Sequence, residues 1–229
     1  LQVAQVTEDQ FSQLAGRIKG GGSDIAGEIA ITSLADFAPL IVPVLTRFQR
    51  DHPGIIMRYL TGARVFRMEY GEAHVAVRAG PAPQDPDNVV QPFCEAQVAL
   101  FVAPDYVARY GLPKDASDLA GHRFVAQDDN FARIAYERWL RARVPAQAIS
   151  FRATDTRAQV QGILAGAGLG FLSHWEAAMH PDLVQALPYN PELSVPLWLV
   201  THVDLHRTAK VQAALAALKA AAPHWPVRA

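Results

Sequence analysis

The sequence predicts an α/β fold with parallel strands, and three consecutive segments near its start carry that prediction. Residues 27–32 form a short run rich in β-branched side chains, long enough for one buried strand. Residues 37–48 place an apolar side chain at every third or fourth position, which is typical of a helix with one buried face. Residues 55–60 are a second apolar run. A strand, a helix and a strand in this order predict a βαβ unit, whose strands run parallel in one sheet.

The turn between the first strand and the helix has the pattern of a capping box. In residues 33–36, Ser-Leu-Ala-Asp, the Ser33 oxygen can accept a backbone N–H while the acidic side chain reaches back. Pro39 falls in the first turn, where proline is tolerated, whereas Pro43 predicts a kink or a shifted start. The helix is expected to stop before His52, because proline and glycine follow it. Its N-terminus then opens at the carboxyl end of a strand, where α/β sheets bind small ligands.

The remaining chain continues to alternate between strands and helices. Strands are predicted at residues 73–78, 89–97, 98–103, 151–154, 168–173 and 197–201, and helices at 63–70, from 104, at 134–140, 156–165 and 207–222. Residues 154–156, Thr-Asp-Thr, repeat the opening arrangement, with hydroxyl groups at a strand-to-helix turn. We therefore expect Thr154, like Ser33, to cap a helix. Either capping is the whole role of these two residues, or their hydroxyls and the nearby backbone N–H groups also hold a ligand.

Residues 1–26 are predicted to hold a helix and a glycine-rich linker. Apolar or small side chains alternate at spacings of three and four over residues 4–18, which is a short heptad seam. The segment is either an amphipathic helix docked on its own domain or the end of a dimerising linker helix. Because the chain begins with Leu1 rather than methionine, we expect a fragment or a processed product.

Length, composition and net charge restrict the classes of protein to which this sequence can belong. The 229 residues suffice for one large domain or two small lobes, with 50% hydrophobic and 19% charged residues. No apolar run approaches the roughly 18 residues of a membrane span. The single cysteine excludes an internal disulfide framework and favours a reducing compartment. A net charge of −1 offers no broad basic surface for nucleic acid.

Motifs for catalysis, metals or cofactors are not found in the sequence. The glycines at 166, 168 and 170 follow a predicted helix, so Gly166 is interpreted as its C-terminal cap and not as part of a dinucleotide loop. Ser173 and His174 are adjacent and lack a nucleophile elbow, which favours a surface histidine. His202 and His206 have no further ligands nearby, which argues against zinc.

Four segments together resemble the effector-binding domain of LysR-type transcriptional regulators, over about residues 10 to 220. They are residues 28–53, 71–78 (Gly-Glu-Ala-His-Val-Ala-Val-Arg), 102–106 (Val-Ala-Pro-Asp-Tyr) and 165–168 (Ala-Gly-Ala-Gly). His74 stands where the family usually has aspartate. The resemblance implies a two-lobed fold of the periplasmic-binding-protein type II kind, with mixed sheets flanked by helices and two hinge crossovers. Lobe I would hold residues 27–97 and 201–229, and lobe II residues 98–200.

The resemblance also implies a function. The domain would bind a small, anionic metabolite in a cleft between the lobes and relay that event to a winged helix-turn-helix, absent here, that binds DNA. Ligand contacts are expected at Ser33, Leu34, Thr61, Gly62, Arg64, Arg78, Thr154, Asp155, Thr156 and Thr201. A structural ion pair is the alternative role of Arg78.

We further expect a cytoplasmic protein that is not an enzyme, carries no cofactor and has no membrane contact. It would form a homodimer, and a tetramer at full length, in which the helix over residues 37–50 meets residues 134–143 of the partner. The alternative is an extracytoplasmic solute-binding receptor of a transporter, which the same fold also serves. The sequence upstream of Leu1 would separate the two, since one requires a helix-turn-helix and the other a signal peptide.

Overall fold

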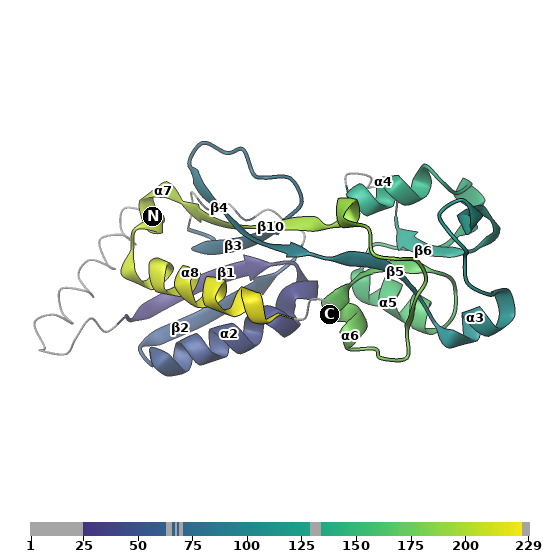
Figure 1. Ribbon diagram of the computed structural model, residues 1–229. Coiled ribbons are helices and arrows are strands. Elements are labelled where there is room, and N and C mark those ends of the chain that lie inside the picture. The colour runs from purple at the N-terminus through teal and green to yellow at the C-terminus, as the bar shows by residue number, and fades with distance from the viewer. Residues whose placement is uncertain (1–24, 63–65, 67, 69–70, 129–133, 226–229) are drawn as a thin grey trace, which may run out of the picture. The chain divides into compact units, whose positions relative to one another are not determined.

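The computed structural model describes residues 25–62, 66, 68, 71–128 and 134–225 (Figure 1). The predicted N-terminal helix, most of the predicted helix at 63–70 and Arg64 lie outside these residues. The described chain divides into two compact units. Unit 1 combines residues 25–94 with Pro196–Trp225, and unit 2 is Glu95–Val195.

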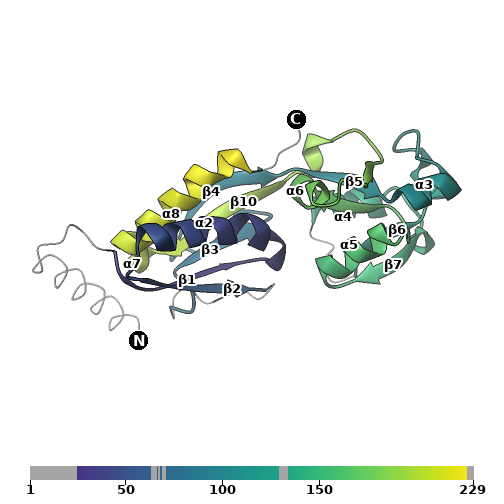
Figure 2. The same ribbon diagram turned by 90° about the horizontal axis from the view of Figure 1, so that it is seen from below.

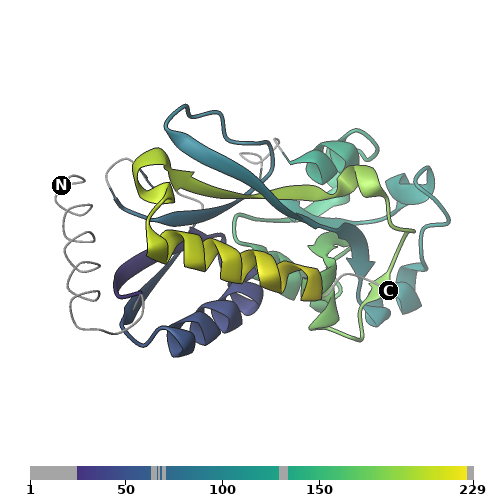
Figure 3. The ribbon, with the colours of Figure 1, turned by 60° about the vertical axis from the view of Figure 1, so that its left-hand side comes forward.

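Unit 1 is built on a five-stranded sheet in the order β2-β1-β3-β10-β4. The strands are β1 (Gly27–Ser33), β2 (Ile55–Thr61), β3 (Val75–Ala79), β4 (Asn88–Ala96) and β10 (Val195–His202). β1 pairs in parallel with both β2 and β3, which confirms the predicted βαβ unit. β10 is antiparallel to β3, so the sheet is mixed. Figure 3 shows β4 beside β10 at the edge of this sheet.

Two helices lie side by side on one face of the sheet, α2 (Ala38–Asp51) and α8 (Ala209–Ala221) (Figure 2). The predicted stripe of α2 is buried at Leu40, Ile41, Leu45 and Phe48. Pro39 lies in the first turn, and Pro43 stays inside the helix. Short helical segments complete unit 1: η1 (Ala35–Phe37), α7 (Val203–His206) and η7 (Ala222–His224).

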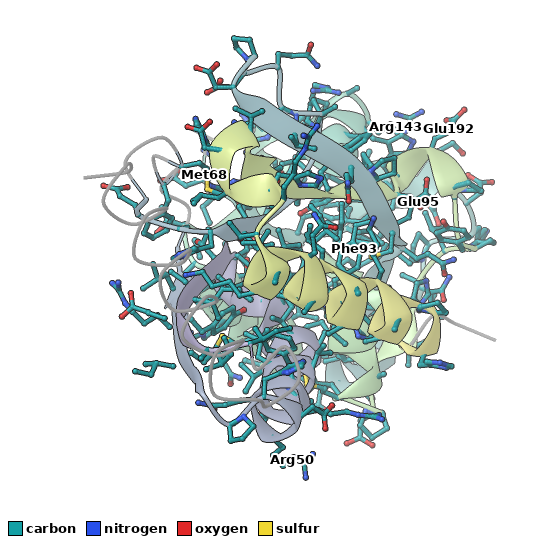
Figure 4. All side chains as sticks on the ribbon, turned by 90° about the vertical axis from the view of Figure 1, so that its left-hand side faces the viewer. Arg50, Met68, Phe93, Glu95, Arg143 and Glu192 are labelled. Carbon is teal, nitrogen blue, oxygen red and sulfur yellow. The ribbon has the colours of Figure 1, made fainter. Side chains whose placement is uncertain are left out.

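Two further sets of contacts stabilise the sheet of unit 1, one at its β4 edge and one on the face that α2 and α8 do not cover. Phe93 of β4 points towards α8, and its ring meets that of Trp225 edge-on at 5.2 Å (Figure 4). On the face away from α2 and α8, Met68, Ala73, Ala76 and Val200 form a buried cluster, against which Trp198 packs. Within this cluster, Ala76 of β3 packs with Val200 of β10.

Unit 2 contains two smaller sheets. The antiparallel one has the order β8-β5-β9, and β6 pairs in parallel with β7. The strands are β5 (Val98–Val102), β6 (Phe124–Gln127), β7 (Ile149–Ala153), β8 (Gly170–Ser173) and β9 (Val184–Gln185). The helices are α3 (Pro104–Tyr110), η3 (Asp118–Gly121), α4 (Ala135–Arg141), η5 (Ala146–Ala148), α5 (Thr156–Leu164), α6 (His174–Ala178) and η6 (Pro191–Leu193). Phe124, Leu140 and Leu169 are fully buried in the core of this unit.

Three local predictions about helix ends and histidines are corrected by the structure. Ser33 is the last residue of β1 and caps no helix, because its hydroxyl bonds Leu34 and Tyr59 instead. Thr154 does not cap α5, because the helix begins at Thr156 and the Asp155 carboxylate accepts two of its N–H groups. His174 begins α6 and is buried, since its ring packs edge-on against those of Phe101 and Tyr189. Gly166 has φ 75° directly after the C-cap Ala165, which confirms the predicted helix end.

Candidate functional site

The carboxyl ends of β1 and β2 bring four predicted ligand residues together. Ser33 is the register partner of Thr61, and the Gly62 N–H donates to the Ser33 carbonyl at 3.2 Å. Leu34 and Gly62 continue directly from the two strands and are partly exposed. Because parallel strands end at one edge, this edge of unit 1 is where a small ligand would find polar groups. Thr61 is exposed there, whereas Ser33 is completely buried.

The bonding state of Ser33 limits what it can do for a ligand. Its Oγ donates to the Leu34 carbonyl at 2.7 Å and lies 2.6 Å from the Tyr59 hydroxyl. A serine hydroxyl carries one hydrogen, so Tyr59 must be the donor in the second bond. Burial raises the pKa of Tyr59, and the Ser33 bond opposes that rise only in part, so the phenol stays protonated. In this arrangement Ser33 has no hydrogen left to donate to a ligand.

Arg78 lies near the carboxyl end of β3, opposite Trp198 of β10. It is partly buried, and burial lowers the pKa of its guanidinium. Within the part of the chain that the structure describes, Arg78 has neither a hydrogen bond nor an ion pair. The neighbouring Trp198 is held by a 2.8 Å hydrogen bond from its Nε1 to the Gly80 carbonyl. A desolvated guanidinium without a counter-charge favours an anion.

Thr201 does not join this edge. β10 runs antiparallel to β3, and the pair Val200 with Ala76 places Thr201 towards the amino end of β3. Its hydroxyl lies 2.9 Å from His206 Nδ1, and the residue is 1% exposed. Thr201 is thus occupied by a structural contact within unit 1.

In unit 2, Thr154 and Asp155 lie between β7 and α5, and Thr156 is the first residue of α5. The Asp155 carboxylate accepts from Arg157 N at 2.8 Å and from Ala158 N at 3.4 Å. The helix N-terminus therefore already holds a negative group. A second anion at the same N–H groups would meet like charge.

With this geometry established, comparison with known proteins identifies the family. Residues 22–223 match the family model described as the LysR substrate binding domain. The chain belongs to the LysR substrate-binding domain family.

This LysR domain is similar to several named regulators. It is 27% identical over 189 residues to the HTH-type transcriptional activator IlvY of Salmonella typhimurium, covering 80% of this chain and 64% of IlvY. It is 28% identical over 120 residues to an HTH-type transcriptional repressor of Pseudomonas aeruginosa, covering 52% of this chain and 38% of the repressor. The chain therefore spans less than two thirds of the length of either relative.

Solved structures confirm the fold of the LysR domain. The regulatory domain of CrgA from Neisseria meningitidis matches with a TM-score of 0.72 and 19% identity, covering 86% of this chain and 100% of that domain. The AmpR effector binding domain from Citrobacter freundii matches with a TM-score of 0.67 and 15% identity, covering 86% of this chain and 98% of that one. The predicted α/β fold of the periplasmic-binding-protein type II kind, with mixed sheets, is thus confirmed.

One polar cluster of the LysR domain was missed by the sequence analysis. Glu137 of α4 is 3% exposed, and its Oε1 accepts from Gln127 N at 3.1 Å. Arg141 Nη2 donates to the Gln127 carbonyl at 2.8 Å, and Arg141 Nε lies 3.7 Å from Glu137 Oε2. The backbone N–H and the carbonyl of Gln127, the last residue of β6, are therefore both hydrogen-bonded to side chains of α4. The i,i+4 spacing of Glu137 and Arg141 was the available signal.

Metal-binding and membrane-spanning features are absent from the described residues. Among them, no three or more histidine, cysteine, aspartate or glutamate side chains gather as metal ligands would. His202 Nδ1 accepts from Asp204 N at 3.3 Å, while His206 bonds Thr201, so the two histidines serve separate contacts. Within the same residues, none of the helices has the length and apolar character needed to cross a membrane.

Proposed function

We propose that this chain is the effector-binding part of a LysR-type DNA-binding transcriptional regulator and that its effector is a small anion held by Arg78. The observation that carries the proposal is the state of Arg78, which is partly buried and has no partner among the described residues. Burial lowers the pKa of this guanidinium, yet arginine stays protonated in proteins, so the positive charge persists. A carboxylate would supply the missing counter-charge through bidentate hydrogen bonds.

The surroundings of Arg78 support a ligand of modest size. The residue lies one position before the end of β3, and β3, β1 and β2 end at the same edge of the sheet. The exposed Thr61 adds a hydroxyl to this edge, and Trp198 offers an apolar surface beside Arg78. A small carboxylate with an apolar portion fits this combination of groups.

The proposed mode of action is a shift between states of the regulator. An effector that binds one state more tightly than another changes the populations of both, and with them the affinity for DNA. DNA would be bound through an N-terminal winged helix-turn-helix of the full-length protein, acting in the cytoplasm as a homodimer. The names of the relatives as HTH-type regulators support this assignment.

An enzymatic role finds little support in the described residues. Thr201 and His206 form a hydroxyl–imidazole pair at 2.9 Å, which is the geometry of a nucleophile with its base. The threonine is 1% exposed, however, so a substrate could not reach it.

The test is a thermal-shift screen of small carboxylates, each paired with its neutral amide. Ligands that bind the native state stabilise it, by about 2.7 kcal/mol at a hundredfold excess over Kd. We expect some carboxylates, and not their amides, to raise Tm, and Arg78→Gln to remove that effect. Arg47→Gln, at an exposed arginine of α2 in the same unit, is the matched control. Carboxylate stabilisation that survives in Arg78→Gln would refute the role of Arg78.

A further inference from the structure

His74 binds both backbone groups of Ala30 where β1 lies beside the start of β3. Its main-chain N–H donates to the Ala30 carbonyl at 2.7 Å, and its ring Nδ1 accepts the Ala30 N–H at 3.0 Å. His74 and Ala30 are each 1% exposed, so both bonds are shielded from water. The imidazole therefore takes the place of a main-chain acceptor, one residue before β3 begins.

This contact lengthens a short ladder. Two register pairs join β1 to β3, at residues 31–32 and 75–76, and the bonds between His74 and Ala30 continue the pairing towards the amino ends of both strands. A buried N–H that loses its acceptor keeps its full desolvation penalty. The pairing of β1 with β3 thus depends on the His74 ring.

The bond also fixes the protonation state of the ring. A backbone N–H can only donate, so Nδ1 of His74 is the unprotonated nitrogen and the ring hydrogen lies on Nε2. An imidazolium carries a hydrogen on both nitrogens and accepts no hydrogen bond. The ordinary charge change of histidine falls between about pH 5 and 8. Mild acid can therefore remove this acceptor.

On β1 and β2, the charged groups of this face of the sheet are Glu28 and Arg58. Arg58 is the register partner of Ala30, so it lies across Ala30 from His74. Its Nη1 is 2.7 Å from Glu28 Oε1, and both side chains are about half exposed. The Glu28 carboxylate is therefore paired with Arg58 and not with the His74 ring.

Within the part of the chain that the structure describes, β3, β10 and the segment before β3 contribute Arg78, His202 and Glu72. Arg78 lies four residues beyond His74 in the sequence, and Glu72, two residues before it, is partly exposed. Continuing the register of β10 with β3 by two residues places His202 opposite His74. The Asp204 carboxylate lies 3.5 Å from Nδ1 of His202, so an acidified His202 has a counter-charge beside it. A proton on His74 would instead add positive charge next to a second histidine.

We propose that His74 makes the pairing of β1 with β3 sensitive to mild acid. A proton on its Nδ1 removes the acceptor of the Ala30 N–H and buries a positive charge, so the ring takes up that proton only when this part of the sheet opens. Below about pH 6.5 the folded state then binds one proton fewer than the unfolded chain. The stability contributed by the neutral ring is present at neutral pH and lost as pH falls. A regulator built on this domain would respond to acid as well as to its effector.

The test compares wild type with His74→Asn, and with His224→Asn at an exposed histidine of the same unit. The asparagine Oδ1 is attached at the same position as the histidine Nδ1 and accepts a hydrogen bond without titrating. Between about pH 7.5 and about pH 5, the unfolding equilibrium constant in denaturant should rise up to about thirtyfold more in wild type than in His74→Asn. His224→Asn should follow wild type. Titrating groups common to the three chains cancel in this comparison.

Two measurements on wild type keep the inference testable even if His74→Asn does not fold. NMR should find the ring hydrogen of His74 on Nε2 at neutral pH. The hydrogen-exchange protection of the Ala30 amide should fall as pH is lowered. A ring hydrogen on Nδ1, an Ala30 protection that acid leaves unchanged, or equal acid destabilisation of wild type and His74→Asn would each overturn the inference.

Discussion

Two substitutions of the Glu137 carboxylate are predicted to change stability in opposite directions at neutral pH, with Glu137→Ala lowering it and Glu137→Gln raising it. Its Oε1 accepts the Gln127 N–H at 3.1 Å, and the side chain is 3% exposed. Glu137→Ala leaves that N–H without its acceptor, which costs about 1–3 kcal/mol for a buried group. At about 2–4 °C per kcal/mol for a chain of this size, Tm should fall by roughly 2–12 °C. Glu137→Gln keeps an acceptor oxygen in the same place and avoids that loss.

The pH dependence of stability distinguishes the effect of the Glu137 charge from the effect of its hydrogen bond to Gln127. Burial raises the pKa of Glu137 above its ordinary value of 4.5, with the Gln127 N–H and Arg141 opposing the rise only in part. A raised folded-state pKa means that the stability contributed by this group is fully present below the unfolded-state pKa. It is lost as pH rises through the folded-state pKa. Glu137→Gln, which never ionises, should therefore match wild type in acid and exceed it at neutral pH.

Denaturant unfolding of wild type, Glu137→Gln and Glu137→Ala at acid and neutral pH measures both effects. Hydrogen exchange at the Gln127 amide adds a local readout, because only Glu137→Ala should lose its protection. A wild type that gains stability over Glu137→Gln as pH rises would refute the argument. That result would mean that the ion pair with Arg141 outweighs the cost of burying the charge.

Three further predictions concern unit 2 and assembly. Asp155→Ala should destabilise the protein by about 0.5–2 kcal/mol in denaturant unfolding, because it removes the cap of α5, while Thr154→Ala should change little. An equal loss in both would contradict the assigned cap. Gly168→Ala should lower Tm sharply, since its Cβ would lie 2.5 Å from the Arg123 carbonyl oxygen, whereas Gly121→Ala, in open space, should not. The proposed homodimer should give twice the chain mass in light scattering, and a monomer at high concentration would count against it.

Much of the fold could be predicted from local patterns. The stripe of α2 and the adjacent runs of β1 and β2 require only their own residues to be recognised. The end of α5 at Gly166 could be predicted because only glycine readily adopts φ 75°. Helix starts were harder to place. A hydroxyl at a strand end has several bonds to choose from, and that of Ser33 bonds the adjacent Leu34 carbonyl and the distant Tyr59. At α5 the neighbouring Asp155 carboxylate, and not the Thr154 hydroxyl, accepts the capping N–H groups.

The order of residues along the chain predicts which candidate residues lie at the same edge of the sheet. It does not predict which of their hydroxyl groups is free to bind a ligand. Ser33 and Thr32 differ by one residue and both carry a hydroxyl, yet only Ser33 meets a partner, Tyr59, on its own face of the sheet. That partner comes from β2, 26 residues away, and its reach depends on the register of the two strands. The same register sets Thr32 beside β3, whose Arg78 has no partner among the described residues. A hydroxyl that the fold has already satisfied stabilises the free protein and has no hydrogen left to donate. Availability for binding is therefore a property of the completed sheet.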